Sequence, residues 1–148
     1  MGDLNGKKRY EIDDAMKAGM QARYWAGCVA KDGVRVEIAK TWAEDHYLMD
    51  PHTAVASAVL RAYQRETGDT RRSVIVSTAS PYKFAQDVLG ALDQKKHPAS
   101  FLTMEMLSAQ TETEIPLPLK TLKEKTVRFT ATVGVDQMKQ CVLEFARD

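Results

Sequence analysis

Apolar residues along the chain follow two patterns, short runs typical of strands and longer stretches with helical spacing. The run Val74–Val76 is continuous, β-branched and bounded by polar residues, as in a strand buried on both faces of a parallel sheet. Residues 127–133 alternate apolar and polar side chains, which predicts a second strand. Because helical stretches lie on both sides of the first strand, we predict an α/β fold, part of a doubly wound sheet with helices flanking few strands.

Helix boundaries are indicated by capping residues. Asp50 is a natural N-cap before Pro51, and Gly68 follows the last apolar repeat of that helix. Ser80 and Pro81 form the same signal after the first strand. Two prolines exclude a helix interior over 115–119. The remaining expected elements are an extended piece at 10–12, helices at 15–29 (capped by Asp13 or Asp14), 34–46 and 100–110, a helical turn at 120–125 and a last helix capped by Asp136.

The composition is that of an ordinary globular protein. A chain of 148 residues with 44% hydrophobic residues can form one core, so we expect residues 1–148 to be a single domain or a fragment of one. The net charge of +1 gives no reason to expect a nucleic-acid or membrane partner. Short basic clusters, such as 7–9, 71–72 and 95–97, contain no aromatic residues, and we interpret them as solvated surface.

Cysteine usage bears on location and on metals. Cys28 and Cys141 are far apart, in no zinc-binding spacing, and we interpret them as reduced thiols of a cytoplasmic protein. We predict no metal site. The N-terminus has no apolar signal region, and no stretch approaches the length of a membrane span.

Two predicted helix starts, at 50–53 and 80–83, are candidates for ligand binding. Free N–H groups and the helix dipole attract anions there, and Lys83 in a first turn adds a positive charge. The alternative is that both are ordinary capped junctions with Lys83 in water. The role of His52 also has two interpretations, since a histidine at a helix start bonds a backbone carbonyl or water more often than it performs catalysis. No known motif supplies a complete active site.

Four stretches, taken together, carry a family resemblance: YLMDPHTAVASAVL, VIVSTASPYKFAQDVL, IPLPLKTLKEKTVRF and the early RYEI. From Arg9 to about Phe145 the chain resembles threonine synthase, specifically the C-terminal portion of the bacterial and fungal type. The resemblance implies a tryptophan-synthase β-like fold and pyridoxal phosphate as cofactor. It also implies a lyase of threonine biosynthesis, which converts O-phospho-L-homoserine and water to L-threonine and phosphate.

We predict six cofactor-binding residues and no catalytic residue, and four of the six are implied by the resemblance. Thr78 matches the family threonine whose hydroxyl meets the pyridine nitrogen, and Asp50, His52 and Thr53 match the element that approaches the cofactor from the neighbouring helix. Ser80, where the family often has histidine, and Lys83 complete the set. The family's Schiff-base lysine and phosphate loop lie upstream and have no match here. We therefore expect a C-terminal fragment that is not catalytic and does not hold the cofactor by itself.

Two further expectations follow. The remainder of the catalytic chain is the expected partner, and apolar surface left exposed in a fragment favours self-association. The two helix starts should converge on one crevice, with Thr78 within roughly 10 Å of residues 50–53, about the spacing of packed layers. The alternative function is an independently folded, non-catalytic module on the same scaffold that binds an anion or a protein.

Overall fold

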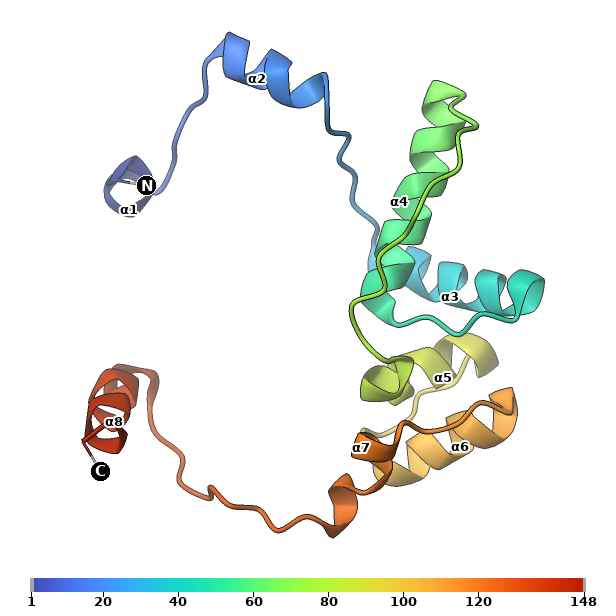
Figure 1. Cartoon of the computed structure of the whole chain (residues 1–148), viewed down its shortest axis with the longest axis vertical. Coiled ribbons are helices and arrows are strands. Elements are labelled where there is room, and N and C mark those ends of the chain that lie inside the picture. Colours follow the sequence, from blue (N-terminus) through green and yellow to red (C-terminus); the bar gives the residue numbers. More distant parts are fainter. Residues whose placement is uncertain (1, 148) are drawn as a thin grey trace. The chain divides into compact units, whose positions relative to one another are not determined.

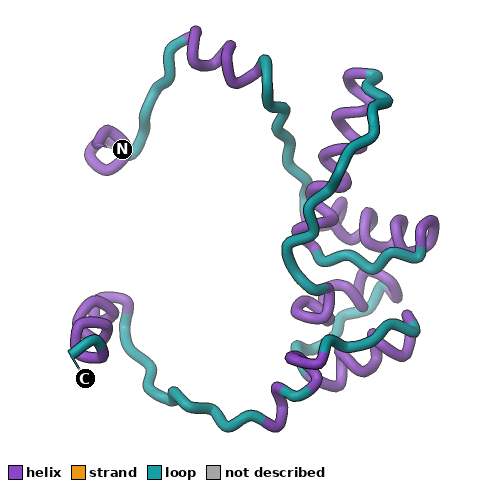
Figure 2. Tube along the Cα trace, viewed as in Figure 1, coloured by secondary structure: helices purple, strands orange, loops and turns teal. Residues whose placement is uncertain are grey.

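Helices and loops make up the structure, a computed structural model that describes residues 2–147. The elements are α1 (Gly2–Lys7), α2 (Asp14–Gln21), α3 (Lys31–Asp45), α4 (Pro51–Thr67), η1 (Pro81–Phe84), α5 (Ala85–Asp93), α6 (Phe101–Thr111), α7 (Leu117–Lys120), η2 (Leu122–Glu124), η3 (Val135–Gln137) and α8 (Met138–Phe145). No strand occurs among the described residues (Figure 2). The predicted α/β fold with a doubly wound sheet is therefore wrong for this chain.

Both predicted strands are present as unpaired segments. Val74, Ile75 and Val76 have neither helical nor ladder structure and are 88%, 36% and 72% exposed. Residues 127–133 are likewise exposed and outside any ladder. A β-branched run becomes a strand only when a neighbouring strand satisfies its backbone groups, and residues 2–147 provide no such neighbour.

The chain divides into two compact units, Met1–Pro116 and Leu117–Asp148. The core of the first unit lies among four helices: α3 packs on α4 and α5, and α5 packs on α6 (Figure 1). Because α5 lies between two helices, it supplies the largest share of the buried apolar residues. The full apolar core is Ile38, Met49, Ala54, Tyr82, Ala85, Val88, Leu89, Ala91 and Leu107. Burial of this set is the main force that holds the unit together.

Local capping signals predicted the main helix starts correctly. Asp50 caps α4 by accepting a hydrogen bond from the His52 backbone N–H at 2.9 Å. Ser80 caps η1 and Ser100 caps α6, each through its hydroxyl oxygen. Gly68 ends α4 in the left-handed conformation, with φ of 71°. These junctions form as predicted because a cap needs only its own neighbours in sequence.

Other boundaries differ from the prediction. Helix α2 stops at Gln21 rather than 29 and buries none of its side chains, so no packing extends it. Helix α3 begins at Lys31 rather than 34, with Gly33 accommodated in its first turn. Helix α7 accommodates Pro118 because its first residues need no intrahelical donor. Asp136 lies inside η3, and Gly134 holds the N-cap position instead.

The second unit is small. Its helix α8 buries no side chain, and the rings of Phe129 and Phe145 meet edge to face at 6.5 Å between centroids. In the part of the chain that the structure describes, every helix falls short of the length and apolar character needed to cross a membrane.

Candidate functional site at the start of helix α4

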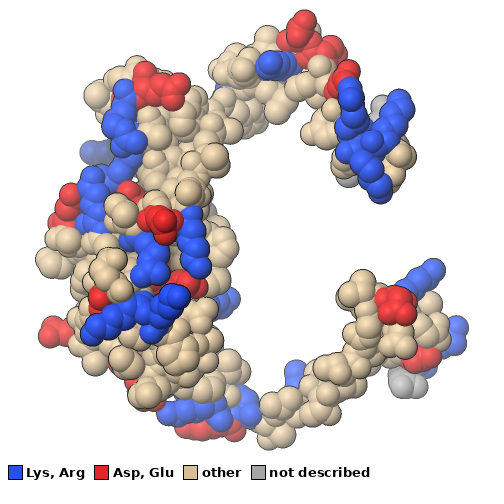
Figure 3. Space-filling model, turned by 180° about the vertical axis from the view of Figure 1, so that it is seen from behind, with Lys and Arg blue, Asp and Glu red and all other residues tan. Residues whose placement is uncertain are grey.

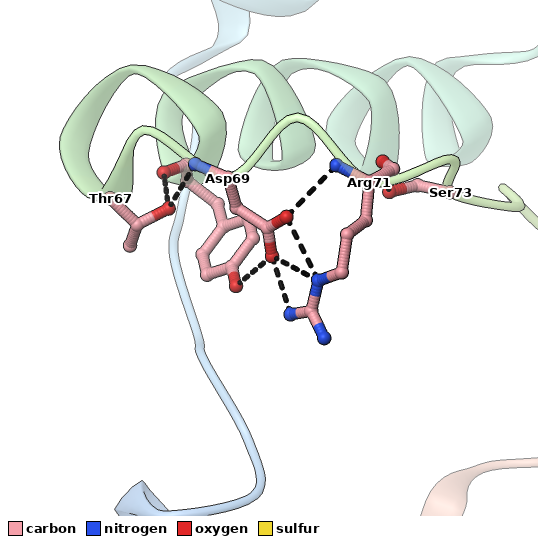
Figure 4. A network of polar contacts seen from close by, with 5 residues as sticks. Thr67, Asp69, Arg71 and Ser73 are labelled. Atoms are coloured by element: carbon pink, nitrogen blue, oxygen red, sulfur yellow. Dashed lines mark hydrogen bonds and ion pairs between the residues drawn. The ribbon is translucent and has the colours of Figure 1, made fainter.

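The chain turns back at the C-terminal end of α4 through a network centred on Asp69 (Figure 4). The Asp69 carboxylate accepts hydrogen bonds from the Tyr63 hydroxyl at 2.7 Å and from the Arg71 guanidinium at 2.5 to 3.0 Å. The bonded Arg71 guanidinium is the main reason why the pKa of Asp69 lies well below its usual range. Together with Gly68, the network fixes the direction in which the chain leaves the helix.

The segment after this turn runs back beside α4 (Figure 1). Ile75 lines a pocket of about 350 Å³ together with Ser57, Leu60 and Arg61 of α4. At the start of the helix, the Thr53 hydroxyl lies 3.2 Å from the Ser77 hydroxyl and hydrogen-bonds to it. The two predicted helix starts are therefore brought close together, although the sheet edge on which the prediction placed them is absent from the described residues.

Asp50 is the buried centre of this junction, with no exposed surface. Its Oδ1 accepts from the His52 backbone N–H, and its Oδ2 accepts from the Thr53 hydroxyl. Burial alone would raise the pKa of Asp50, but the hydrogen bonds from Thr53 and His52 outweigh it and hold the pKa below its ordinary value. The carboxylate is consequently ionised at neutral pH and oriented within the helix start.

His52 projects from the same turn, and its side chain is 65% exposed. Its Nδ1 lies 3.0 Å from Asp50 Oδ1. On its other side the imidazole meets the ring of Phe84 edge to face, at 5.0 Å between centroids. The start of α4 and the 3₁₀ turn η1 are thus joined by an aromatic contact as well as by the Thr53–Ser77 bond.

Ser80 and Lys83 lie at the second helix start. The Ser80 hydroxyl oxygen accepts from the Tyr82 backbone N–H at 3.3 Å, so this serine acts as a cap. Lys83 is exposed and lines a pocket of about 340 Å³ between η1 and the start of α6, which Phe84, Ser100 and Phe101 also line. Lys83 belongs to η1, which contacts His52 through Phe84, and Ser80 is the N-cap of η1.

Thr78 directly follows Ser77 and is exposed. Its hydroxyl has no hydrogen-bond partner among the described residues, in contrast to the hydroxyls of Ser77 and Thr53. An exposed hydroxyl next to the Thr53–Ser77 contact can donate to a ligand bound at this junction. The structure therefore leaves the Thr78 hydroxyl open to solvent.

Sequence reasoning missed Ser77 and Phe84, which make the contacts between the two motifs. Ser77 could have been identified from the sequence because it immediately precedes Thr78. It also missed a buried ion pair beneath the site: Glu37, which is 6% exposed, accepts hydrogen bonds from Ser57 at 2.6 Å and from Arg61 at 2.8 Å. This pair ties α3 to α4 and so supports the helix that carries His52.

Two of the predicted basic clusters contain residues that pair with acidic side chains. On the face drawn in Figure 3, lysine and arginine side chains lie among aspartate and glutamate over the packed helices of the first unit, whereas basic side chains form a group near α1. Arg71 pairs with Asp69, and His97 pairs with Asp93 at 2.8 Å. The described side chains form no group of three potential metal ligands.

Comparison with known proteins places this junction in a family. The model of the family "Threonine synthase, C-terminal" matches residues 53–142, more than half of the chain. The chain belongs to this family. The match begins at Thr53 and includes Ser77, Thr78 and η1, whereas Asp50 and His52 immediately precede it.

Two curated relatives are similar over part of their length. The chain is 26% identical over 129 residues to "Threonine synthase-like 2" of Xenopus laevis, which covers 86% of the chain and 23% of the relative. It is 30% identical over 93 residues to "Threonine synthase-like 1" of Homo sapiens, which covers 63% of the chain and 12% of the relative. The chain thus spans less than a quarter of the length of either protein.

Proposed function

We propose that this chain is the C-terminal portion of a threonine synthase of the bacterial and fungal type, here called the full-length protein. That enzyme converts O-phospho-L-homoserine and water to L-threonine and phosphate, as a lyase of threonine biosynthesis, with pyridoxal phosphate as cofactor. The observation that carries the proposal is the Thr53–Ser77 contact, which joins the two family motifs at one place. The separate free cysteines fit a cytoplasmic enzyme.

Pyridoxal phosphate supplies an electron-withdrawing ring to the amino-acid substrate when it is bound. In the proposal, the hydroxyl of Thr78 donates a hydrogen bond to the pyridine nitrogen. A neutral hydroxyl leaves this nitrogen largely unprotonated, whereas a carboxylate would keep it cationic. The exposure of Thr78 and its lack of a protein partner support this role.

The other residues of the junction shape the ring site in the proposal. Asp50 is buried and engaged in the helix cap, so it acts through Thr53 and His52 rather than by touching the cofactor. His52 and Thr53 form the wall next to the ring, while Ser80 sets the turn and Lys83 adds positive charge for an anionic substrate. The phosphate of the cofactor needs residues outside this chain.

The remainder of the enzyme is the proposed partner of the exposed apolar surface. Val74 and Val76 lie on the segment that leads to Thr78, and both are largely in water. A neighbouring strand from the remainder of the enzyme would satisfy the backbone of this segment and fix the position of Thr78. In its absence the same surface favours self-association.

Two assays test the proposal. The full-length protein with pyridoxal phosphate is expected to release phosphate and L-threonine from O-phospho-L-homoserine, whereas the 148-residue chain releases neither. In the second assay the chain is incubated with pyridoxal phosphate, reduced with borohydride and mapped by mass spectrometry, and no single lysine is expected to be labelled stoichiometrically. Turnover by the chain alone with one lysine labelled would contradict the fragment proposal, and an inactive full-length protein would contradict the proposed reaction.

A further inference from the structure

Asp50 fixes the orientation of the His52 imidazole through hydrogen bonds. The hydrogen bond between Nδ1 of His52 and Oδ1 of Asp50 is 3.0 Å long, and the carboxylate belongs to a residue with no exposed surface. The same oxygen accepts the His52 backbone N–H at 2.9 Å, so the histidine is held to Asp50 at two points. The imidazole is therefore oriented by a buried anion in its own helix cap.

An ionised carboxylate can only accept hydrogen bonds, so in a neutral imidazole the ring hydrogen must sit on Nδ1. The pKa of Asp50, which its hydrogen bonds keep low against the effect of burial, maintains that ionised form at neutral pH. Nε2 is then left with a lone pair. Because the side chain of His52 is 65% exposed, a ligand has access to the imidazole.

His52 contacts the second helix start through its ring. Phe84, from η1, contacts the imidazole through an aromatic ring. Asp50 in the α4 cap is the charged group bonded to the imidazole, and Lys83, which precedes Phe84 in η1, is exposed. A lysine ammonium can only donate hydrogen bonds, so it does not compete for the proton that Nε2 can accept.

We propose that Asp50 is a positioning residue that holds neutral His52 in the Nδ1–H form, and that Nε2 is the proton acceptor of the site. The identity of the proton donor rests on the proposed function: it is the water co-substrate. When the water oxygen bonds to carbon, one O–H bond breaks and its proton goes to Nε2. The resulting imidazolium faces the Asp50 carboxylate and later releases the proton to solvent. The water oxygen bonds to the inner side-chain carbon of the substrate, and phosphate leaves from the terminal carbon with the electrons of its own C–O bond. In the net reaction one C–H bond of the inner carbon breaks and one C–H bond forms at the terminal carbon, which becomes the methyl group of threonine.

The positioning role is tested on the 148-residue chain by long-range ¹H–¹⁵N correlation NMR of its three histidines at pH 8. His52 is expected as the Nδ1–H form. His97 is an internal control with the opposite expectation, because its Nε2 lies 2.8 Å from Asp93. Variants His46→Gln and His97→Gln assign the signals.

Asp50→Asn should abolish the preference of His52 for one form, and Asp93→Asn should leave that preference intact. Asparagine is itself a good N-cap, so the helix start is expected to survive the change. The spectrum of the unchanged protein is decisive even if the variant does not fold. An Nε2–H form of His52, or a mixture of both forms, overturns the positioning role.

The proton-acceptor role is tested in the full-length protein. His52→Gln is expected to lower kcat by roughly 10² to 10⁴-fold with little change in KM, and the control His46→Gln to leave both unchanged. Unchanged kcat in His52→Gln overturns the role. If the full-length protein is inactive before any substitution, the proposed function has failed, and the NMR result still decides the positioning role.

Discussion

The hydroxyls of Thr53 and Ser77 lie 3.2 Å apart, although 24 residues separate them in the sequence. Thr53 belongs to the first turn of α4, and Ser77 belongs to the segment that returns from the far end of that helix. This contact places Thr78, the next residue, beside the buried cap formed by Asp50. It is the structural basis for treating the two motifs as one site.

Thr53→Val should destabilise the first unit by about 1–3 kcal/mol, because valine keeps the shape but bonds to neither Asp50 nor Ser77. Urea unfolding followed by circular dichroism measures the loss. Thr70→Val, at an exposed position after α4, is the matched control and should change little. A double-mutant cycle with Ser77→Ala should give a coupling of about 1 kcal/mol, and zero coupling would argue against the contact.

The stability contributed by Asp50 should depend on pH. The pKa of Asp50 is lowered in the folded chain, so the unfolded chain binds more protons and stability increases with pH in this range. The contribution is complete above the ordinary value of 3.8 and is lost as pH falls through the folded pKa. We expect the gap in unfolding free energy between the unchanged chain and Asp50→Asn to narrow below pH 4.

Asp45→Asn, at the exposed end of α3, removes the same charge and serves as the control. The difference in unfolding free energy between Asp45→Asn and the unchanged chain should vary much less over the same pH range. If the difference in unfolding free energy between the unchanged chain and Asp50→Asn stays constant with pH, the hydrogen bonds of Asp50 do not favour its ionised carboxylate.

Gly90→Ala should destabilise the core. A Cβ at this position would lie 2.6 Å from the backbone carbonyl oxygen of Lys95, which cannot move away as a flexible side chain could. The Lys95 backbone N–H is bonded to Asp93 at 2.9 Å, which helps to hold the loop. The expected loss is about 1–3 kcal/mol, despite the better helix propensity of alanine.

Gly19→Ala is the control for this substitution, because nothing lies within 4 Å of the added methyl group in α2. It should be neutral or stabilise α2 by up to about 1 kcal/mol. Equal changes in melting temperature for Gly90→Ala and Gly19→Ala would mean that the Lys95 carbonyl does not crowd position 90.

Thr78→Val in the full-length protein should weaken cofactor binding and slow turnover while the fold is retained. Valine preserves the β-branched shape and removes the hydroxyl, and a lost hydrogen bond in a buried site costs about 1–3 kcal/mol. Fluorescence titration with pyridoxal phosphate and a phosphate-release assay measure the two effects. Thr70→Val is again the control, and unchanged affinity and turnover in Thr78→Val would remove Thr78 from the site.

Helix starts were predictable from sequence because their determinants are local. Asp50 before Pro51, and Ser80 before Pro81, fix a cap through atoms only two or three residues away. The same information placed the candidate residues at the two junctions. The sequence-based argument for the closeness of the junctions used the edge of a sheet that does not form, and in the structure the segment after α4 instead returns beside the helix without pairing.

The predicted sheet failed because strand formation depends on partners. Val74–Val76 has the composition of a buried strand, yet a strand needs hydrogen bonds from a neighbour, and the described residues offer none. The apolar run is suited to a strand buried in a sheet, and the described residues do not form a sheet. The Glu37–Arg61 pair was missed for a related reason, since the partners lie on different helices and no local spacing indicates them.

The most direct test of the central claim is a structure of the full-length protein with pyridoxal phosphate bound. We expect the Thr78 hydroxyl to lie about 2.6–3.2 Å from the pyridine nitrogen, next to the Thr53–Ser77 contact and with His52 at the wall of the same site. A ring nitrogen that faces another residue, with Thr78 in solvent or on another surface, would exclude Thr78 from the cofactor site.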